Sequence, residues 1–169
     1  MKTWTRFTGG LLACGLALST ASAEEESALV TYQTLSPETA QALAEATLAA
    51  CRKEGYQVAV SVVDRAGVPQ VMLRDRYAGA HTPDTATRKA WTAVSFRTDT
   101  LALADITQPG KLQSGVRDVT NALMIGGAVP VEVAGSLVGA VGVSGAPDGK
   151  LDDDCARAGL AAIEDKLAF

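Results

Sequence analysis

The chain has 169 residues, of which 47% are hydrophobic, 20% charged and 5% aromatic, a composition typical of one ordinary globular domain. This excludes a disordered segment, a collagen-like chain and a disulfide-stapled miniprotein. The 15 Lys and Arg residues against 19 Asp and Glu give a net charge of -4, which argues against nucleic-acid binding because neutralising phosphates needs a basic surface.

The N-terminal residues have the pattern of a secretory signal peptide. Lys2 and Arg6 precede an apolar stretch over residues 7–18, and small residues ending at Ala23 come directly before three glutamates. We therefore expect cleavage after Ala23 and a periplasmic or secreted protein. A lipoprotein anchored through Cys14 is the minor alternative. A buried N-terminal helix fits less well, because the charged end, the apolar core and the small residues follow the order of a signal peptide.

The mature chain begins with a polar segment. Residues 24–35 carry three consecutive glutamates and predict a flexible arm. Ser36 as a cap and Pro37 at the first helical position then begin an amphipathic helix that reaches Lys53 and ends before Gly55. Beyond the signal peptide, no apolar run approaches the roughly 20 residues that a membrane span needs, so we expect no membrane insertion of the mature chain.

A hairpin and two helices follow. Residues 58–63 are rich in β-branched side chains and apolar on both faces, as in a strand covered on both sides. The turn at 64–67 leads into a second strand at 69–74. A Thr-Pro-Asp sequence then predicts a helix over 83–96, and a short helix is expected near 98–104.

The second half predicts three more strands and a closing helix. The strands are expected at 122–125, 129–133 and 137–144, and the helix at 152–167. No crossover helix joins each successive strand, so the order predicts an α/β (α+β) fold with a largely antiparallel, five-stranded sheet flanked by helices. We expect one such domain over residues 36–169.

Two cysteines remain after the predicted cleavage. Cys51 and Cys155 both fall on the apolar face of a predicted helix. Thiols of exported proteins tend to pair, so a disulfide between them is one interpretation, and two separate buried thiols are the other. The spacing does not suit a metal site, because the sequence has no Cys-x-x-Cys.

Motifs of common enzyme classes are missing. A single histidine, His81, excludes an HExxH motif and any multi-histidine metal centre. Residues 142–146 approach a nucleophile elbow but lack its closing glycine. Gly139, Gly142 and Gly145 fit neither the dinucleotide fingerprint nor a P-loop, and we expect them to let another backbone or a flat ligand approach closely. A binding protein is thus favoured over an enzyme.

His81 is the candidate metal ligand. It directly precedes a predicted helix, where the helix dipole favours the neutral imidazole that can ligate a metal. A solvated or capping histidine is the alternative. Met72, Met124 and Tyr77 could also reach an iron, although ordinary packing is the simpler role for each of them.

Cationic side chains are frequent around His81 in the sequence. They could hold carboxylates or phosphates, or they could form solvated salt bridges with acids such as Asp75 and Asp84. The cations are Arg74, Arg76, Arg88, Lys89, Arg97 and Arg117.

Five segments occur together in an informative order. They are Val-Val-Asp-Arg-Ala-Gly at 62–67, Arg74 to Gly79, Arg-Lys-Ala-Trp-Thr-Ala-Val-Ser-Phe at 88–96, Gly126-Gly127 with Pro130, and Gly-Ala-Val-Gly-Val-Ser-Gly-Ala at 139–146. In combination they resemble the GlcG/HbpS family of haem-binding proteins, which is related to the C-terminal domain of PduO-type corrinoid adenosyltransferases. The resemblance covers the chain from about residue 36 to its end.

The resemblance implies a profilin-like fold, homo-oligomers from dimers to octamers, and haem as the cofactor, with a corrinoid as the less favoured tetrapyrrole. It implies an exported scavenger, carrier or sensor accessory, with a membrane sensor or a haem transport component as the partner. His81 would ligate the haem iron, and the hydroxyl of Ser114 lies roughly where some family members place a ligand. A haem also needs an apolar slot and cations for its propionates, and Arg76, Lys89 and Arg117 are the candidates.

Two other functions remain open. A small-metabolite enzyme could use His81 as an acid or base at a subunit interface. An oligomeric signalling partner would need no cofactor at all.

Overall fold

The computed structural model describes residue 1 and residues 28–167. The predicted signal peptide, including Cys14 and Ala23, lies outside these residues. The folded unit begins at Tyr32. At the end of the segment predicted as an arm, Leu35 is buried: its N–H donates to the carbonyl of Val138 at 3.1 Å, and its own carbonyl accepts from the Gln70 side chain.

The described residues of this unit contain one antiparallel sheet of four strands in the order β2-β1-β4-β3. The strands are β1 (Ala59–Asp64), β2 (Pro69–Arg74), β3 (Ala128–Val133) and β4 (Ser136–Ser144). The two central strands are almost wholly buried, because helices cover both of their faces. The predicted antiparallel sheet is confirmed, but the strand number of five is wrong.

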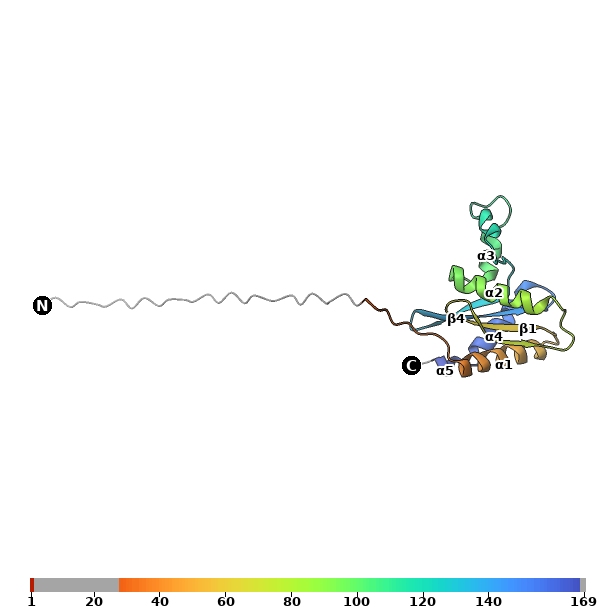
Figure 1. The fold of residues 1–169 in the computed structure, drawn as a ribbon, viewed down its shortest axis with the longest axis horizontal. Coiled ribbons are helices and arrows are strands. Elements are labelled where there is room, and N and C mark those ends of the chain that lie inside the picture. The colour runs from red at the N-terminus through yellow and green to blue at the C-terminus, as the bar shows by residue number, and fades with distance from the viewer. Residues whose placement is uncertain (2–27, 168–169) are drawn as a thin grey trace. The chain divides into compact units, whose positions relative to one another are not determined.

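Helices cover both faces of the sheet (Figure 1). They are α1 (Pro37–Lys53), α2 (Thr82–Phe96), α3 (Thr100–Ile106), a 3-10 helix η1 (Ser114–Asp118), α4 (Gly149–Ala161) and α5 (Glu164–Leu167). α1 and α4 pack side by side on one face, whereas α2 packs on the other. Among the described residues, no helix combines the length and hydropathy that a membrane crossing requires.

The segment predicted as a strand at 122–125 is a loop. Its backbone bonds to side chains of α2 instead of to a neighbouring strand: the N–H of Leu123 donates to the Thr92 hydroxyl at 2.9 Å, and the carbonyl of Ala122 accepts from Arg88 at 3.2 Å. Ala122 and Met124 pack against Leu103 of α3 in a small separate cluster. The apolar run that predicted the strand therefore reflects packing under α3.

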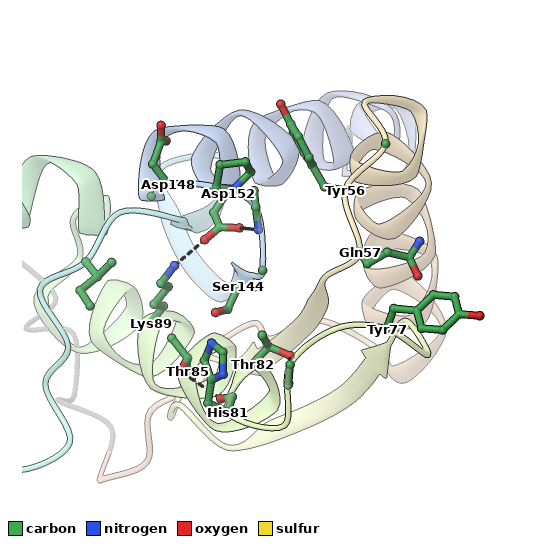
Figure 2. Close-up of a pocket in the computed structure, with 17 residues that line it drawn as sticks. Tyr56, Gln57, Tyr77, His81, Thr82, Thr85, Lys89, Ser144, Asp148 and Asp152 are labelled. Carbon is green, nitrogen blue, oxygen red and sulfur yellow. Dashed lines mark hydrogen bonds and ion pairs between the residues drawn. The ribbon is translucent and has the colours of Figure 1, made fainter.

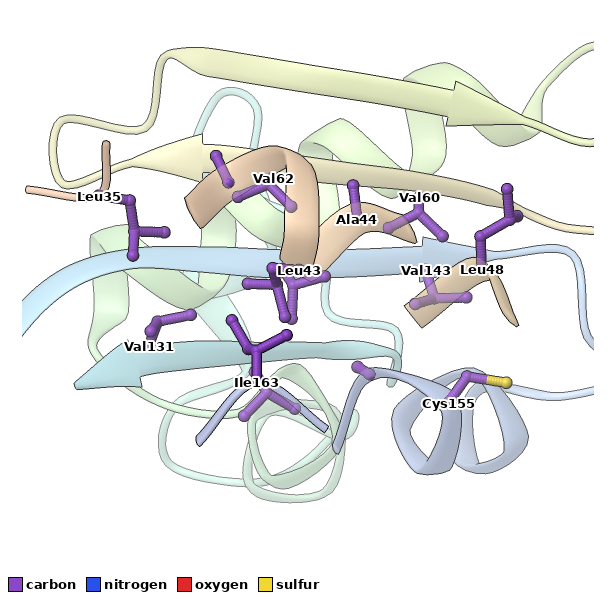
Figure 3. Close-up of a cluster of buried hydrophobic side chains, with 14 of the residues drawn as sticks. Leu35, Leu43, Ala44, Leu48, Val60, Val62, Val131, Val143, Cys155 and Ile163 are labelled. Atoms are coloured by element: carbon purple, nitrogen blue, oxygen red, sulfur yellow. The ribbon is translucent and has the colours of Figure 1, made fainter. Parts of the chain in front are cut away.

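The main core lies between the sheet and the helices α1 and α4 (Figure 3). Val60, Val62 and Val143 of the central strands belong to one buried cluster with Leu43 of α1. At one edge of this core, Cys51 of α1 and Cys155 of α4 form a disulfide with their Cα atoms 5.2 Å apart. The sequence left open a disulfide or two separate buried thiols, and the structure has the disulfide.

The opposite face of the sheet is packed more closely. A Cβ atom placed on Gly142 of β4 would meet the carbonyl oxygen of Ala86, and the amide nitrogen of Ala90 at 2.8 Å. Small residues on both elements thus bring the backbone of α2 against β4. The expectation that a glycine here admits another backbone is confirmed for Gly142.

We expect Gly142→Val to destabilise the protein by about 3 kcal/mol or more, because an overpacked side chain must displace the α2 backbone rather than a flexible neighbour. Urea unfolding measures the loss. Gly115→Ala is the control, since a Cβ there meets nothing within 4 Å, and its change should stay within about 0.5 kcal/mol. Equal stabilities of the two variants would contradict the close packing of α2 on β4.

Candidate functional site

A cavity of about 680 Å³ opens where the first turns of α2 and α4 meet the end of β4 (Figure 2). The loop between α1 and β1 supplies Tyr56 and Gln57, and the segment before α2 supplies Tyr77 and His81. The end of β4 and the loop 145–148 close the remaining side. Its volume falls in the range of small-molecule and cofactor sites, roughly 300–1,000 Å³.

His81 lines this cavity at the N-terminal end of α2. Its backbone carbonyl accepts from the N–H and the hydroxyl of Thr85, at 3.1 and 2.9 Å, and so fixes the residue at the helix start. The imidazole makes no capping hydrogen bond. It packs over Gly79, where an added Cβ would lie 2.7 Å from the ring. Local structure therefore holds the backbone and leaves the ring nitrogens for a ligand.

Lys89 is not a surface cation. Its side chain is 2% exposed, and its ammonium donates to a carboxylate oxygen of Asp152 at 2.8 Å and to the carbonyl of Val143 at 3.0 Å. The other oxygen of Asp152 accepts from the N–H of Ala146 at 2.9 Å. The pair thereby joins α2, the end of β4 and the first turn of α4. Lys89 lines the cavity but is already neutralised, so the structure gives it no free charge for a propionate.

The ion pair occupies space that only a glycine leaves open. A Cβ on Gly127 would lie 2.8 Å from the Lys89 ammonium nitrogen and 2.6 Å from the Cβ of Asp152. Burial raises the pKa of the Asp152 carboxyl above its ordinary value, and the attraction of Lys89 opposes that rise. The carboxylate form of Asp152 thus depends on its partner.

Arg76 lies beside the cavity. Its guanidinium stacks over the exposed ring of Tyr77, 5.9 Å from the centroid. The neighbouring Asp75 is buried and pairs with Arg52 rather than with Arg76, the Nε–carboxylate distance being 2.8 Å. Arg76 is therefore an exposed cation next to a residue that lines the cavity.

Ser114 and Arg117 lie outside this cavity, in η1. The Arg117 guanidinium donates to the carbonyls of Thr107 and Ala104, at 2.6 and 3.0 Å, and so attaches η1 to α3. Within one chain, the structure does not bring these two predicted site residues to His81. Their role in a site remains a prediction that a second copy of the chain would have to fulfil.

The other predicted candidates are mostly structural. Arg74 donates to the carbonyl of Ala78 at 2.6 Å, and Met124 is buried in the cluster under α3. Arg97 begins the loop after α2 with a positive φ of 51°. Met72 is partly exposed on β2 and does not line the cavity, whereas Tyr77 does. No group of three or more His, Cys, Asp or Glu side chains within the described residues could hold a metal ion.

The sequence does not predict most of the residues that line the cavity as site residues, among them Ser144, Gln57 and Asp152. Ser144 is the last residue of β4, and Gln57 lies two positions before β1. Asp152 is a buried acid in the amphipathic helix α4. The sequence signal for Asp152 is weak: it directly follows Leu151, which the sequence places on the apolar face of the last helix. The signal for Ser144 was present in the rejected nucleophile-elbow segment.

The chain matches one protein family, described as "Haem degrading protein HbpS-like", over residues 35–161. Among curated proteins it is similar to the corrinoid adenosyltransferase PduO of Salmonella typhimurium, with 35% identity over 108 residues. The aligned part is 63% of this chain but 32% of PduO, so the chain corresponds to about a third of that relative.

Two solved structures are also similar. A doubly substituted HbpS of Streptomyces reticuli has 35% sequence identity and a TM-score of 0.75, over 94% of this chain and 99% of that one. A complex of PduOC with haem has 32% identity and a TM-score of 0.72, over 77% of this chain and 95% of that one. These likenesses confirm the fold class predicted from the resemblance.

We expect Lys89→Met to lower the free energy of unfolding by about 3–5 kcal/mol, because it leaves the Asp152 carboxylate buried without its partner. Lys150→Met is the matched control: Lys150 pairs with Asp154 on the surface, where water screens the attraction, and its loss should leave the free energy of unfolding close to that of the wild type. Urea unfolding of both variants measures the difference.

The pH dependence of the Lys89→Met variant follows from the raised pKa of Asp152. A carboxyl whose pKa is higher in the folded than in the unfolded state binds its proton more tightly when folded. The variant should thus be most stable below the ordinary Asp pKa of about 3.9 and lose stability as the pH rises through the folded pKa. A variant whose stability stays level from pH 4 to 8 would show that Asp152 is not held in the carboxylate form by Lys89.

Proposed function

This chain belongs to the HbpS-like family of haem-degrading proteins, and from that membership we propose that it binds haem in the cavity lined by His81. The observation that carries the proposal is an imidazole without a capping bond in a cavity of about 680 Å³. The structure of a family relative in complex with haem supports the ligand class.

The residues present fit a haem. Its apolar disc needs flat and apolar walls, which Tyr56, Ile125 and Pro147 offer, and an axial donor, which His81 offers. A bound haem would supply an iron that carries further ligands and changes oxidation state. His81 would hold and orient it, while the surrounding walls would exclude water from the iron.

Arg76 is the proposed contact for the propionates. It is exposed, it lies beside the cavity, and its guanidinium is held over Tyr77. Lys89, the other nearby cation, already has a carboxylate partner in the interior. We therefore propose that the propionate edge of the macrocycle faces the solvent at Arg76 and that the opposite edge enters the cavity.

The function can be tested by titrating haemin into untagged protein that lacks the first 23 residues. We expect a shifted Soret band of stoichiometric amplitude, and its loss or displacement in His81→Ala. Because His81 is the single histidine of the sequence, any imidazole-bound spectrum must come from it. Ser95→Ala, on the exposed side of α2, serves as the control and should bind as the wild type does. Wild-type protein that leaves the haemin spectrum unchanged would refute haem binding.

Adding peroxide or a reductant to the haem complex formed in this titration separates a carrier from an enzyme. A Soret band that persists with peroxide or a reductant favours a scavenger, carrier or sensor accessory, and a band that decays catalytically favours haem degradation. If Ser114→Ala, rather than His81→Ala, abolishes the spectrum, the iron ligand is the hydroxyl in η1 and not the imidazole.

We further propose export through the predicted signal peptide. The disulfide between Cys51 and Cys155 supports it, because such bonds persist in oxidising compartments. The N-terminal sequence of the exported protein tests the proposal, since cleavage after Ala23 makes Glu24 the first residue.

Self-association is also proposed. The segment from α3 to η1 projects from the sheet in Figure 1 and carries exposed apolar side chains, among them Ile106, Leu112 and Val119. Contact with a second copy would bury them. Sedimentation should give a dimer or a larger even-numbered assembly, and Leu112→Asp should dissociate it; a wild-type monomer would contradict the proposal.

A further inference from the structure

Ser144 is an almost buried residue whose hydroxyl opens onto the cavity. The residue is 5% exposed, stands at the last position of β4 and lines the cavity. In Figure 2 its oxygen points toward the side of the cavity where His81 and Thr85 lie. No hydrogen bond links this oxygen to any group in residues 28–167. The oxygen is reached from the cavity and bonds to no group in these residues, so a polar atom of a molecule bound in the cavity could take it as a hydrogen-bond partner.

The charges around Ser144 indicate what kind of atom this is. The inner end of the cavity holds one ammonium, that of Lys89, and it is balanced by the carboxylate of Asp152 at 2.8 Å. Asp148 also lines the cavity and caps α4 with its carboxylate. An anionic group placed here would meet two carboxylates and one cation that is already paired. Among the described side chains, the inner end thus offers an anion no unpaired cation, whereas a neutral oxygen needs none.

We propose that the inner end of the cavity recognises an uncharged oxygen-bearing group on the rim of the bound macrocycle, with the Ser144 hydroxyl as its hydrogen-bond partner. The inference rests on the proposed haem site, because it assumes that the propionates face Arg76. In Figure 2, Tyr77, which Arg76 covers, and Lys89 lie on opposite sides of the cavity. A haem whose propionates lie at Arg76 and Tyr77 would therefore present the opposite edge of its macrocycle to Lys89 and the inner end of the cavity.

Three iron porphyrins that differ only at that rim test the proposal. Iron protoporphyrin carries vinyl groups opposite its propionates, iron haematoporphyrin carries hydroxyethyl groups there, and iron deuteroporphyrin disulfonate carries sulfonates. We expect the wild type to bind the hydroxyethyl compound roughly fivefold more tightly than the vinyl compound, the gain of one hydrogen bond to the Ser144 hydroxyl. The sulfonated compound should bind at least about tenfold more weakly, since burying its charges is not compensated.

Ser144→Ala provides the matched protein variant. It should lose the preference for the hydroxyethyl compound, so that the ratio of its affinities for the two compounds falls to about one. Ser95→Ala, outside the cavity, should retain that preference. The unfolding midpoint of each variant shows whether it is folded, and the ratios measured for the wild type test the proposal without any variant.

The outcomes are separable from those for the proposed function. Equal affinities of the wild type for the vinyl and hydroxyethyl compounds, or an equal preference in Ser144→Ala, would overturn the role of Ser144 while haem binding stands. Tight binding of the disulfonate would overturn the neutral inner end in the same way. If none of the three compounds binds, the haem site and this inference both fail.

Discussion

One buried ion pair holds together the end of the molecule where the cavity lies. The ammonium of Lys89 and the carboxylate of Asp152 are both almost fully removed from water, and such a pair is tolerated because further hydrogen bonds complete it. Those bonds go to the carbonyl of Val143 and the N–H of Ala146. Three segments that are distant in sequence thereby converge on one point, and Gly127 leaves the space that the pair occupies. The walls of the cavity depend on this convergence.

The two faces of the sheet are packed in different ways. The face toward α1 and α4 carries the large aliphatic core and the disulfide, and so supplies most of the burial. The face toward α2 is packed through small residues such as Ala90 and Gly142, which bring two backbones together. Close approach fixes the direction of α2, and with it the position of His81 at the helix start. A stable core on one side thus supports a precisely placed histidine on the other.

Local patterns predicted most of the fold, and failed where long-range contacts decide. Ser36 and Pro37 fixed the start of α1 because capping is local, and its observed start agrees. The segment 122–125 was misassigned, because nothing local shows that α2 side chains take its backbone hydrogen bonds. The same difference between local patterns and long-range contacts decides which site residues the sequence predicts. His81 was found as a lone histidine before a helix, whereas the pairing of Lys89 with Asp152, 63 positions later, requires the folded chain.

The disulfide has a consequence for proteolysis. Cys51 and Cys155 lie near the two ends of the folded unit, 104 positions apart in the sequence. A protease that cuts the backbone at any single place between them, such as the exposed loop around Leu112, leaves both fragments covalently attached. A nicked chain would therefore keep its two fragments together, and on a denaturing gel it would separate into two bands only after reduction.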